Sequence, residues 1–135
     1  MAAELAYWRW RFIVDSDGLR DTQVVTEHTF FRARFTGLEL DLTMPPWSAQ
    51  RATWRHPTDY AACQELASLA RALEPPVQAI RYESARREGG ACQAVFDVRT
   101  LRLPRQPLQQ TWICKTTRHR VLWSHESGSL QFEMA

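Results

Sequence analysis

The sequence predicts an α+β domain in which two helices pack on a mixed, mainly antiparallel sheet. Two segments show the apolar spacing of a helix, and several others alternate between apolar and polar residues or are rich in β-branched and aromatic residues. A chain of 135 residues suits one domain with its own core, and no low-complexity linker divides it. We therefore expect a single domain over residues 1–135.

The composition excludes several classes of protein. With 44% hydrophobic and 24% charged residues, the chain has a globular balance rather than that of a disordered segment. Its apolar runs are too short to span a bilayer, and its first residues lack the features of an export signal, so we expect a cytoplasmic protein with no membrane partner. A net charge of +2 gives no indication of direct nucleic-acid binding. The three cysteines, an odd number without close spacing, indicate buried, reduced thiols.

The first helix is expected over residues 2–14. Its apolar residues recur at intervals of three and four, which places them on one face. They are Leu5, Trp8 and Phe12. Glu4 and Arg11, seven residues apart, share another face.

A long strand is expected next, from Val24 to Phe35, after a turn at residues 15–18. One side of this strand carries Phe31, Ala33 and Phe35, and the other carries Arg32 and Arg34. Residues 37–57 show no sustained period, which indicates an irregular loop. Trp47 and Trp54 would anchor that loop.

The second helix begins after a cap at Thr58 or Asp59 and ends before Pro75. Its apolar residues are Cys63, Leu66, Ala70 and Leu73.

The remaining pattern is β-rich. A short strand over 77–82, a polar loop over 83–90 and a strand with alternating apolar residues follow the second helix. The alternating residues are Cys92, Ala94, Phe96 and Val98. Two further β segments are expected at 110–115 and 130–134, with a turn near Ser127.

Several common chemistries find no support in the sequence. The four histidines are scattered, and none lies in a metal-binding spacing, so no metal is expected. A triad of Ser84, His125 and Asp97 can be written, but no nucleophile-elbow sequence surrounds the serine. Gly89 and Gly90 are too few for a phosphate-binding glycine loop of known spacing.

The segment 79–96 carries the most specific pattern in the chain. It reads Ala-Ile-Arg-Tyr-Glu-Ser-Ala-Arg-Arg-Glu-Gly-Gly-Ala-Cys-Gln-Ala-Val-Phe, a strand ending in Tyr-x-Ser-x-Arg, then Gly-Gly, then an apolar strand. This segment resembles the RES-domain family, named for conserved Arg, Glu and Ser. Residues 54–66, with Asp59-Tyr60 and Gln64, resemble the family's Asp-Tyr-x-x-x-Gln helix start, and Glu4 lies where the family has its Glu-bearing helix.

The resemblance implies a fold related to ADP-ribosyltransferases and an activity on NAD. Characterised members degrade NAD or transfer ADP-ribose, as toxins that an Xre-type antitoxin neutralises. The implied catalytic residues are Glu4, as a carboxylate that stabilises an oxocarbenium-like state, and Ser84, as a hydrogen-bond donor. The implied NAD-binding residues are Arg86, Tyr82, Gly89, Gly90 and Gln64. Arg86 would pair with the pyrophosphate, and the glycines would let the backbone turn close to the ligand.

One departure from the family pattern bears on activity. Members usually carry a segment before the Glu-bearing helix that supplies an Arg and a Tyr to the NAD pocket, whereas this sequence starts almost at Glu4. Three explanations stay open: the chain has lost full activity, a second chain completes the pocket, or another arginine substitutes. The candidate arginines are Arg9, Arg32 and Arg34. The alternative function is a binding module that engages a protein or nucleotide without turnover, and a weaker one is a nucleic-acid binder that uses the basic strand.

Each singled-out residue also has a purely structural interpretation. Glu4 suits the positive end of a helix dipole. Ser84 and Arg86 are residue types that organise turns and solvated surfaces. Tyr60 and Gln64, one helical turn apart, are spaced as a packing pair.

Overall fold

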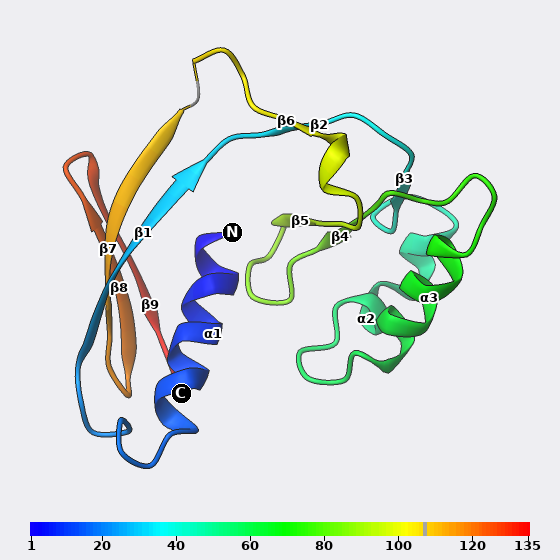
Figure 1. The fold of residues 1–135 in the computed structure, drawn as a ribbon. Helices are drawn as coiled ribbons and strands as arrows, with labels where there is room; N and C mark the ends of the chain where they lie inside the picture. Colours follow the sequence, from blue (N-terminus) through cyan, green and yellow to red (C-terminus); the bar gives the residue numbers. More distant parts are fainter. Residues whose placement is uncertain (107) are drawn as a thin grey trace. The chain divides into compact units, whose positions relative to one another are not determined.

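The computed structural model describes residues 1–106 and 108–135 (Figure 1). The chain forms two compact units. The first unit combines Met1–Arg32 with Pro104–Ala135, and the second is Ala33–Leu103. Each unit contains its own cluster of buried apolar side chains. The expected single domain over 1–135 stays a prediction.

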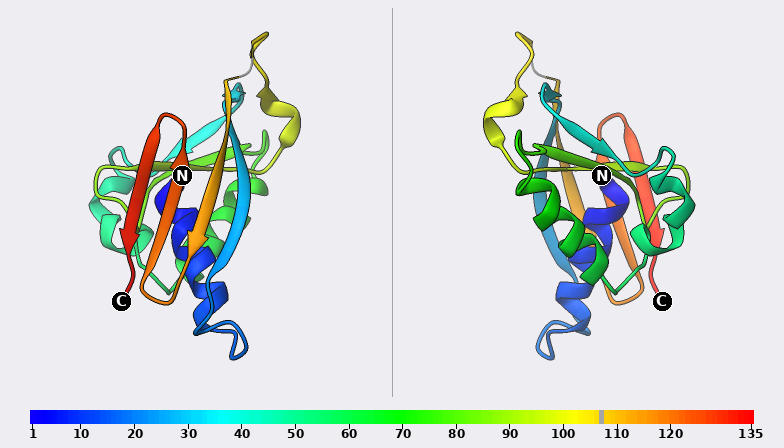
Figure 2. Two further views of the ribbon diagram at one scale, coloured as in Figure 1. Left: turned by 90° about the vertical axis from the view of Figure 1, so that its left-hand side faces the viewer. Right: turned by 90° about the vertical axis from the view of Figure 1, so that its right-hand side faces the viewer.

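The first unit is a four-stranded antiparallel sheet with a helix on one face. The strands lie in the order β1-β7-β8-β9, so β1 and β9 are the edges. They are β1 (Val24–Phe31), β7 (Gln109–Thr116), β8 (Arg120–His125) and β9 (Gly128–Glu133). The helix α1 (Ala2–Val14) contacts β7 and β8, and Figure 2 shows it running along the sheet.

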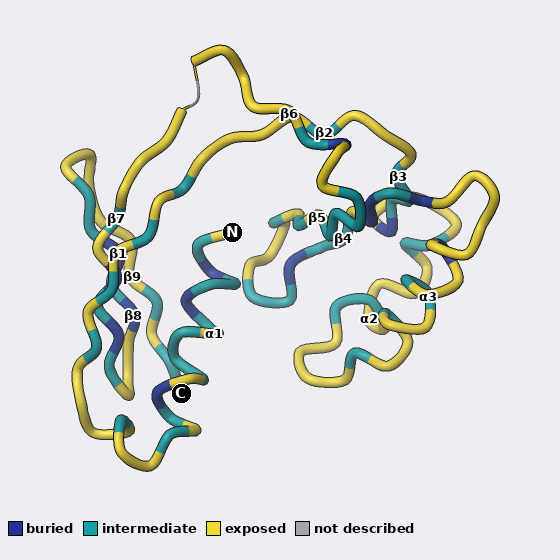
Figure 3. Tube along the Cα trace, in the orientation of Figure 1, coloured by how far each residue is buried: buried dark blue, intermediate teal, exposed yellow. Residues whose placement is uncertain are grey.

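The core of this unit lies between α1 and the central strands, where Figure 3 shows its buried positions. Its fully buried members are Ala6, Cys114, Val121 and Trp123. Alternate residues of each strand face this core, as the half-buried, exposed alternation along β1 shows. The Trp123 ring is packed edge-on by Phe30 at a centroid distance of 5.3 Å.

The predicted bounds of the first helix are confirmed, but of the three residues on its predicted apolar face Leu5 packs against the core and the other two are exposed. Trp8 and Phe12 are 53% and 54% exposed. The buried residues are Ala3, Ala6 and Ile13. Short alanine side chains allow a helix to approach a sheet closely, whereas a tryptophan at the same position would hold it away.

The predicted long strand over 24–35 is also wrong. β1 ends at Phe31, and Arg34–Phe35 forms a separate strand, β2, which pairs with β6 (Leu101–Arg102). Phe31 is exposed and Phe30 packs on the core, because the register between β1 and β7 sets which phenylalanine faces inward. The strand β8, which carries Val121 and Trp123, was not predicted.

The second unit contains a three-stranded sheet and the remaining helices. The sheet order is β3-β4-β5, with β3 parallel to β4 and β4 antiparallel to β5. The strands are β3 (Glu39–Asp41), β4 (Ala79–Glu83) and β5 (Ala91–Val95). The helices are the 3-10 turns η1 (Trp47–Gln50) and η2 (Val98–Thr100) and the α-helices α2 (Arg51–Trp54) and α3 (Ala61–Arg71).

The core of the second unit combines residues of β4 and α3 with residues of the connecting segments. It contains the buried residues Leu42, Ala70, Val77 and Ile80. Trp47 and Trp54 pack against it with ring centroids 6.1 Å apart, and Trp54 Nε1 donates to the Trp47 carbonyl at 2.8 Å. The two tryptophans therefore anchor the segment as predicted.

Several predicted details of the second unit need correction. Residues 37–57 are not an irregular loop, because they contain β3, η1 and α2. In α3 the Asp59 carboxylate accepts from Ala61 N, as a cap at Asp59 would, but Leu73 lies beyond the helix end and is exposed. Val98 is exposed in η2 rather than buried on a strand.

The predicted fold class is confirmed. The structure is α+β with mainly antiparallel sheets, and within the described residues only β3 and β4 pair in parallel. The described residues form three α-helices rather than the expected two, because the four residues of α2 are too few to show a helical period. No helix in the described part of the chain is long and apolar enough to cross a membrane. Cys114 is buried as expected, whereas Cys63 and Cys92 are half-buried.

Candidate functional site

The candidate site is the turn that joins β4 to β5. Glu83 pairs with Ala91 as the last register pair of the hairpin, so residues 84–90 form the connection. Ser84 N donates to the Gly90 carbonyl at 2.7 Å, and Gly90 N donates to the Arg87 carbonyl at 3.0 Å. These bonds close the turn on itself.

Ser84 organises the turn from inside. Its side-chain hydroxyl oxygen accepts hydrogen bonds from the backbone N–H groups of Arg86 and Arg87, each at 3.1 Å. The residue is only 3% exposed, so both donors are satisfied within the protein. Ser84 therefore has a structural role, in line with the turn-organising interpretation.

The two glycines meet steric requirements of the same turn. Gly89 has φ +65°, in the left-handed region that residues with a side chain rarely adopt. A Cβ on Gly90 would lie 3.1 Å from the Arg87 carbonyl oxygen, closer than ordinary packing allows. Both positions therefore favour glycine whether or not a ligand binds nearby.

Arg86 connects the turn to the segment before α3. Its Nη2 donates to the Pro57 carbonyl at 2.5 Å and to the Tyr60 hydroxyl at 3.3 Å. The Tyr60 hydroxyl itself donates to the Pro57 carbonyl at 2.8 Å. The Tyr-x-Ser-x-Arg and Asp-Tyr motifs, separate in sequence, thus meet in space through Arg86 and Tyr60.

Four charged side chains, one of them from the turn itself, form a network of ion pairs. Arg51 makes two bonds to the Glu83 carboxylate, at 2.5 and 2.6 Å, and its Nη2 also donates to Glu88 at 2.7 Å. Arg55 Nη1 lies 2.8 Å from the other Glu88 oxygen, and Arg55 Nε donates to the Ser84 carbonyl at 2.9 Å. Hydrogen bonds from Arg51 hold the pKa of Glu83 below its usual value, and those to Glu83 and Glu88 raise the pKa of Arg51.

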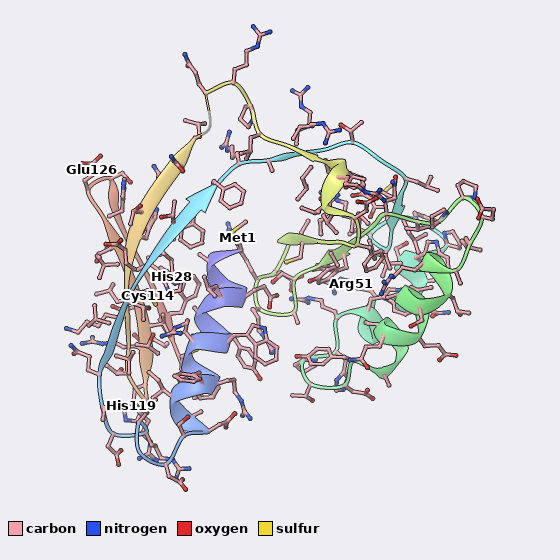
Figure 4. The ribbon with its side chains drawn as sticks, viewed as in Figure 1. Met1, His28, Arg51, Cys114, His119 and Glu126 are labelled. Carbon is pink, nitrogen blue, oxygen red and sulfur yellow. The ribbon has the colours of Figure 1, made fainter. Side chains whose placement is uncertain are left out.

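A hollow of about 480 Å³ lies beside this network. Its lining residues are Thr43, Arg51, Arg81, Glu83, Glu88, Gly89, Gly90 and Ala91. Arg51, labelled in Figure 4, comes from α2, which contacts β4. The wall therefore combines guanidinium groups, carboxylates and the backbone of the glycine turn, a set that suits a polar, charged ligand better than an apolar one.

Most of the predicted site residues lie in the second unit. Ser84, Arg86, Gly89 and Gly90 share the turn, and Tyr82 lies on β4. Gln64 is exposed on α3 and is connected to Tyr60 through its backbone, Gln64 N donating to the Tyr60 carbonyl at 2.9 Å.

Glu4 lies in the first unit, half-buried in the first turn of α1, where its charge is favourable for the helix dipole. The structure therefore brings the predicted residues of the turn together within the second unit, whereas Glu4 belongs to the first unit. Of the arginines considered as substitutes, Arg32 and Arg34 are exposed and Arg9 is half-buried on α1.

Arg51, Arg55 and Glu88 were not among the residues predicted for the site. The two arginines are four residues apart, as on one helical face, and α2 extends over residues 51–54. A helix of four residues shows no sustained period in the sequence, so this spacing alone does not distinguish α2 from a loop. Among residues 1–106 and 108–135, no group of three His, Cys, Asp or Glu side chains is arranged to hold a metal ion.

Comparison with protein families bears directly on these residues. The family model described as RES domain matches residues 2–119. The chain belongs to the RES domain family. A search of curated proteins found no match. The match includes Glu4, the Asp-Tyr segment and the whole Ser84–Gly90 turn of this RES domain, and it confirms the resemblance seen in the sequence.

Proposed function

We propose that this RES domain acts on NAD and cleaves the bond between nicotinamide and ribose. The ADP-ribose is then taken up by water (hydrolysis), by phosphate (phosphorolysis) or by another acceptor (ADP-ribosyl transfer). Family membership over residues 2–119 supports this proposal. The observation that carries it is the glycine turn at 84–90 beside a hollow lined by arginines, since NAD is a dinucleotide with a charged pyrophosphate.

The chemistry assigns a role to each proposed residue. Glu4 supplies the carboxylate that stabilises positive charge on the ribose as the nicotinamide leaves. Ser84 donates a hydrogen bond to the nicotinamide or ribose, and Arg86 binds the pyrophosphate. Arg86 already binds Pro57 and Tyr60, so a phosphate at this residue would compete with those contacts. Tyr82 and Gln64 complete the proposed set of NAD contacts.

The biological role that we propose follows the family. The protein acts as a cytoplasmic toxin that lowers NAD, and an Xre-type antitoxin neutralises it. Expression alone should then arrest growth and lower cellular NAD, and co-expression with the Xre-type partner should restore both. Arrest that persists in the Glu4→Ala variant would argue against NAD loss as its cause.

Purified protein provides the direct test. NAD should disappear with wild type, with and without phosphate as acceptor, and it should persist with Glu4→Ala. Glu126→Ala removes an exposed carboxylate in the β8–β9 turn; it is the matched control and should retain wild-type turnover. Intact NAD in the presence of well-folded wild type would contradict the proposal for this chain.

A second candidate is a binding module with the RES fold and no turnover. The contacts of Ser84 and Arg86 favour it, because the serine oxygen already accepts two backbone N–H groups and Arg86 bridges to Pro57. This candidate predicts saturable NAD binding without loss of NAD. The two functions are therefore separated by measuring binding and turnover on one sample.

A further inference from the structure

We propose that Arg51 and Arg55 form a phosphoryl-binding subsite and that Glu88 occupies it in the absence of a ligand. The inference deepens the proposed function, on which it relies for the identity of the ligand as NAD. The chemical class that the subsite binds is a phosphate or pyrophosphate group.

The geometry around Glu88 is that of an anion held by two cations. Arg51 Nη2 donates to one carboxylate oxygen at 2.7 Å, and Arg55 Nη1 lies 2.8 Å from the other. Two guanidinium groups therefore converge on two oxygens of one anion. Phosphate presents pairs of oxygens with closely similar spacing, and arginine is the side chain most suited to bind them.

The two arginines are held in place without Glu88. Arg51 makes its paired bonds to Glu83, and Arg55 Nε donates to the Ser84 carbonyl. The Glu83 side chain is only 19% exposed and lies in the hairpin, so this support is fixed. Removal of Glu88 would leave both cationic groups oriented toward the same point.

Glu88, in contrast, is easily displaced. Its side chain is 77% exposed, and ion pairs at such exposed positions contribute little because water and salt screen them. The next residue is Gly89, at φ +65°, and glycine lets the backbone change conformation at low cost. Glu88, Gly89 and Arg51 line the 480 Å³ hollow, so a ligand in that hollow contacts Arg51 and the Glu88 carboxylate that Arg55 also binds.

The exchange is tested with inorganic pyrophosphate as the probe. We expect Glu88→Gln, which keeps the side-chain shape and removes the charge, to lower the Kd for pyrophosphate by about tenfold at low salt. Adding Arg55→Gln to that variant should abolish the gain. Glu126→Gln removes an exposed carboxylate in the other unit and is the matched control, with an unchanged Kd expected. Equal affinities for wild type and Glu88→Gln, or an equal gain in Glu126→Gln, would overturn the proposal.

A second measurement uses the unaltered chain, so that a poorly folded variant does not decide the outcome. Titration of wild type with pyrophosphate should shift the NMR signals of the Glu88, Gly89 and Gly90 amides at the lowest concentrations. Unshifted signals in this turn at saturating probe would equally overturn the proposal. Failure of the NAD proposal is distinguishable, because pyrophosphate binding with no NAD turnover refutes that proposal and leaves the subsite intact.

Discussion

Removal of the Ser84 hydroxyl should loosen the candidate site from within. The hydroxyl oxygen accepts two backbone hydrogen bonds of 3.1 Å and is almost fully buried. At roughly 0.5–1.5 kcal/mol for each net hydrogen bond, Ser84→Ala should reduce the local stability of the turn by about 1–3 kcal/mol. The amides of Arg86 and Arg87 lose their acceptor, so their exchange with solvent reports the loss directly.

Amide hydrogen exchange followed by NMR gives the readout for this substitution. If local opening limits exchange, about 1–3 kcal/mol corresponds to roughly a 5- to 150-fold faster exchange at Arg86 and Arg87. Ser129→Ala, an exposed serine on β9, is the matched control and should leave these amides unchanged. Rates within twofold of wild type in Ser84→Ala would refute the assigned role of Ser84 in organising the turn. The exchange rates also help to interpret any loss of activity in Ser84→Ala, because a loosened turn would weaken ligand binding even if the Ser84 hydroxyl does not contact the ligand.

Three other perturbations test the structure. Trp123→Ala should lower the free energy of unfolding in urea by about 3–5 kcal/mol, because this ring is fully buried. Trp8→Ala removes a half-exposed ring and should lower it much less. Similar losses for the two variants would contradict the assigned core. Burial of the imidazole, and secondly the positive charge of Arg9 on α1, lower the pKa of His28 from its usual 6.5. At pH values near and below 6.5 the folded protein therefore binds fewer protons at this residue than the unfolded chain. The free energy of unfolding should therefore be steady above neutral pH and fall as the pH drops below about 6.5. His28→Gln should make this fall shallower. An unchanged fall in the variant would show that His28 does not cause it. Gly89→Ala should destabilise the turn by about 1–2 kcal/mol because of its positive φ, and Gly18→Ala, at an open position, should be nearly neutral in thermal unfolding; equal Tm values would argue against the described turn.

The sequence predicted the positions of elements better than their faces. The helix over 2–14 and the hairpin around residues 84–90 follow from local spacing and turn residues. The buried face of the first helix does not, because hydropathy favours Trp8 over Ala6, whereas close packing against a sheet selects the small residue. The choice between Phe30 and Phe31 depends on the register with β7, a partner distant in sequence.

The candidate site was likewise only partly predictable. The motif identified Ser84, Arg86 and both glycines, because their types and order are specific to one family. Their contacts were not predictable, since Arg86 binds a carbonyl in the segment before α3 and Arg51 comes from a helix of four residues. Helices this short have too few turns to show a period, so tertiary structure is needed to bring their side chains to the site.

NAD consumption by purified protein decides whether this RES domain acts on NAD. Wild type and Glu4→Gln are compared with Glu126→Gln as the control, and folding is confirmed for each by thermal unfolding. We expect loss of NAD with wild type and with the control, and intact NAD with Glu4→Gln. Intact NAD in all three folded samples would contradict this expectation.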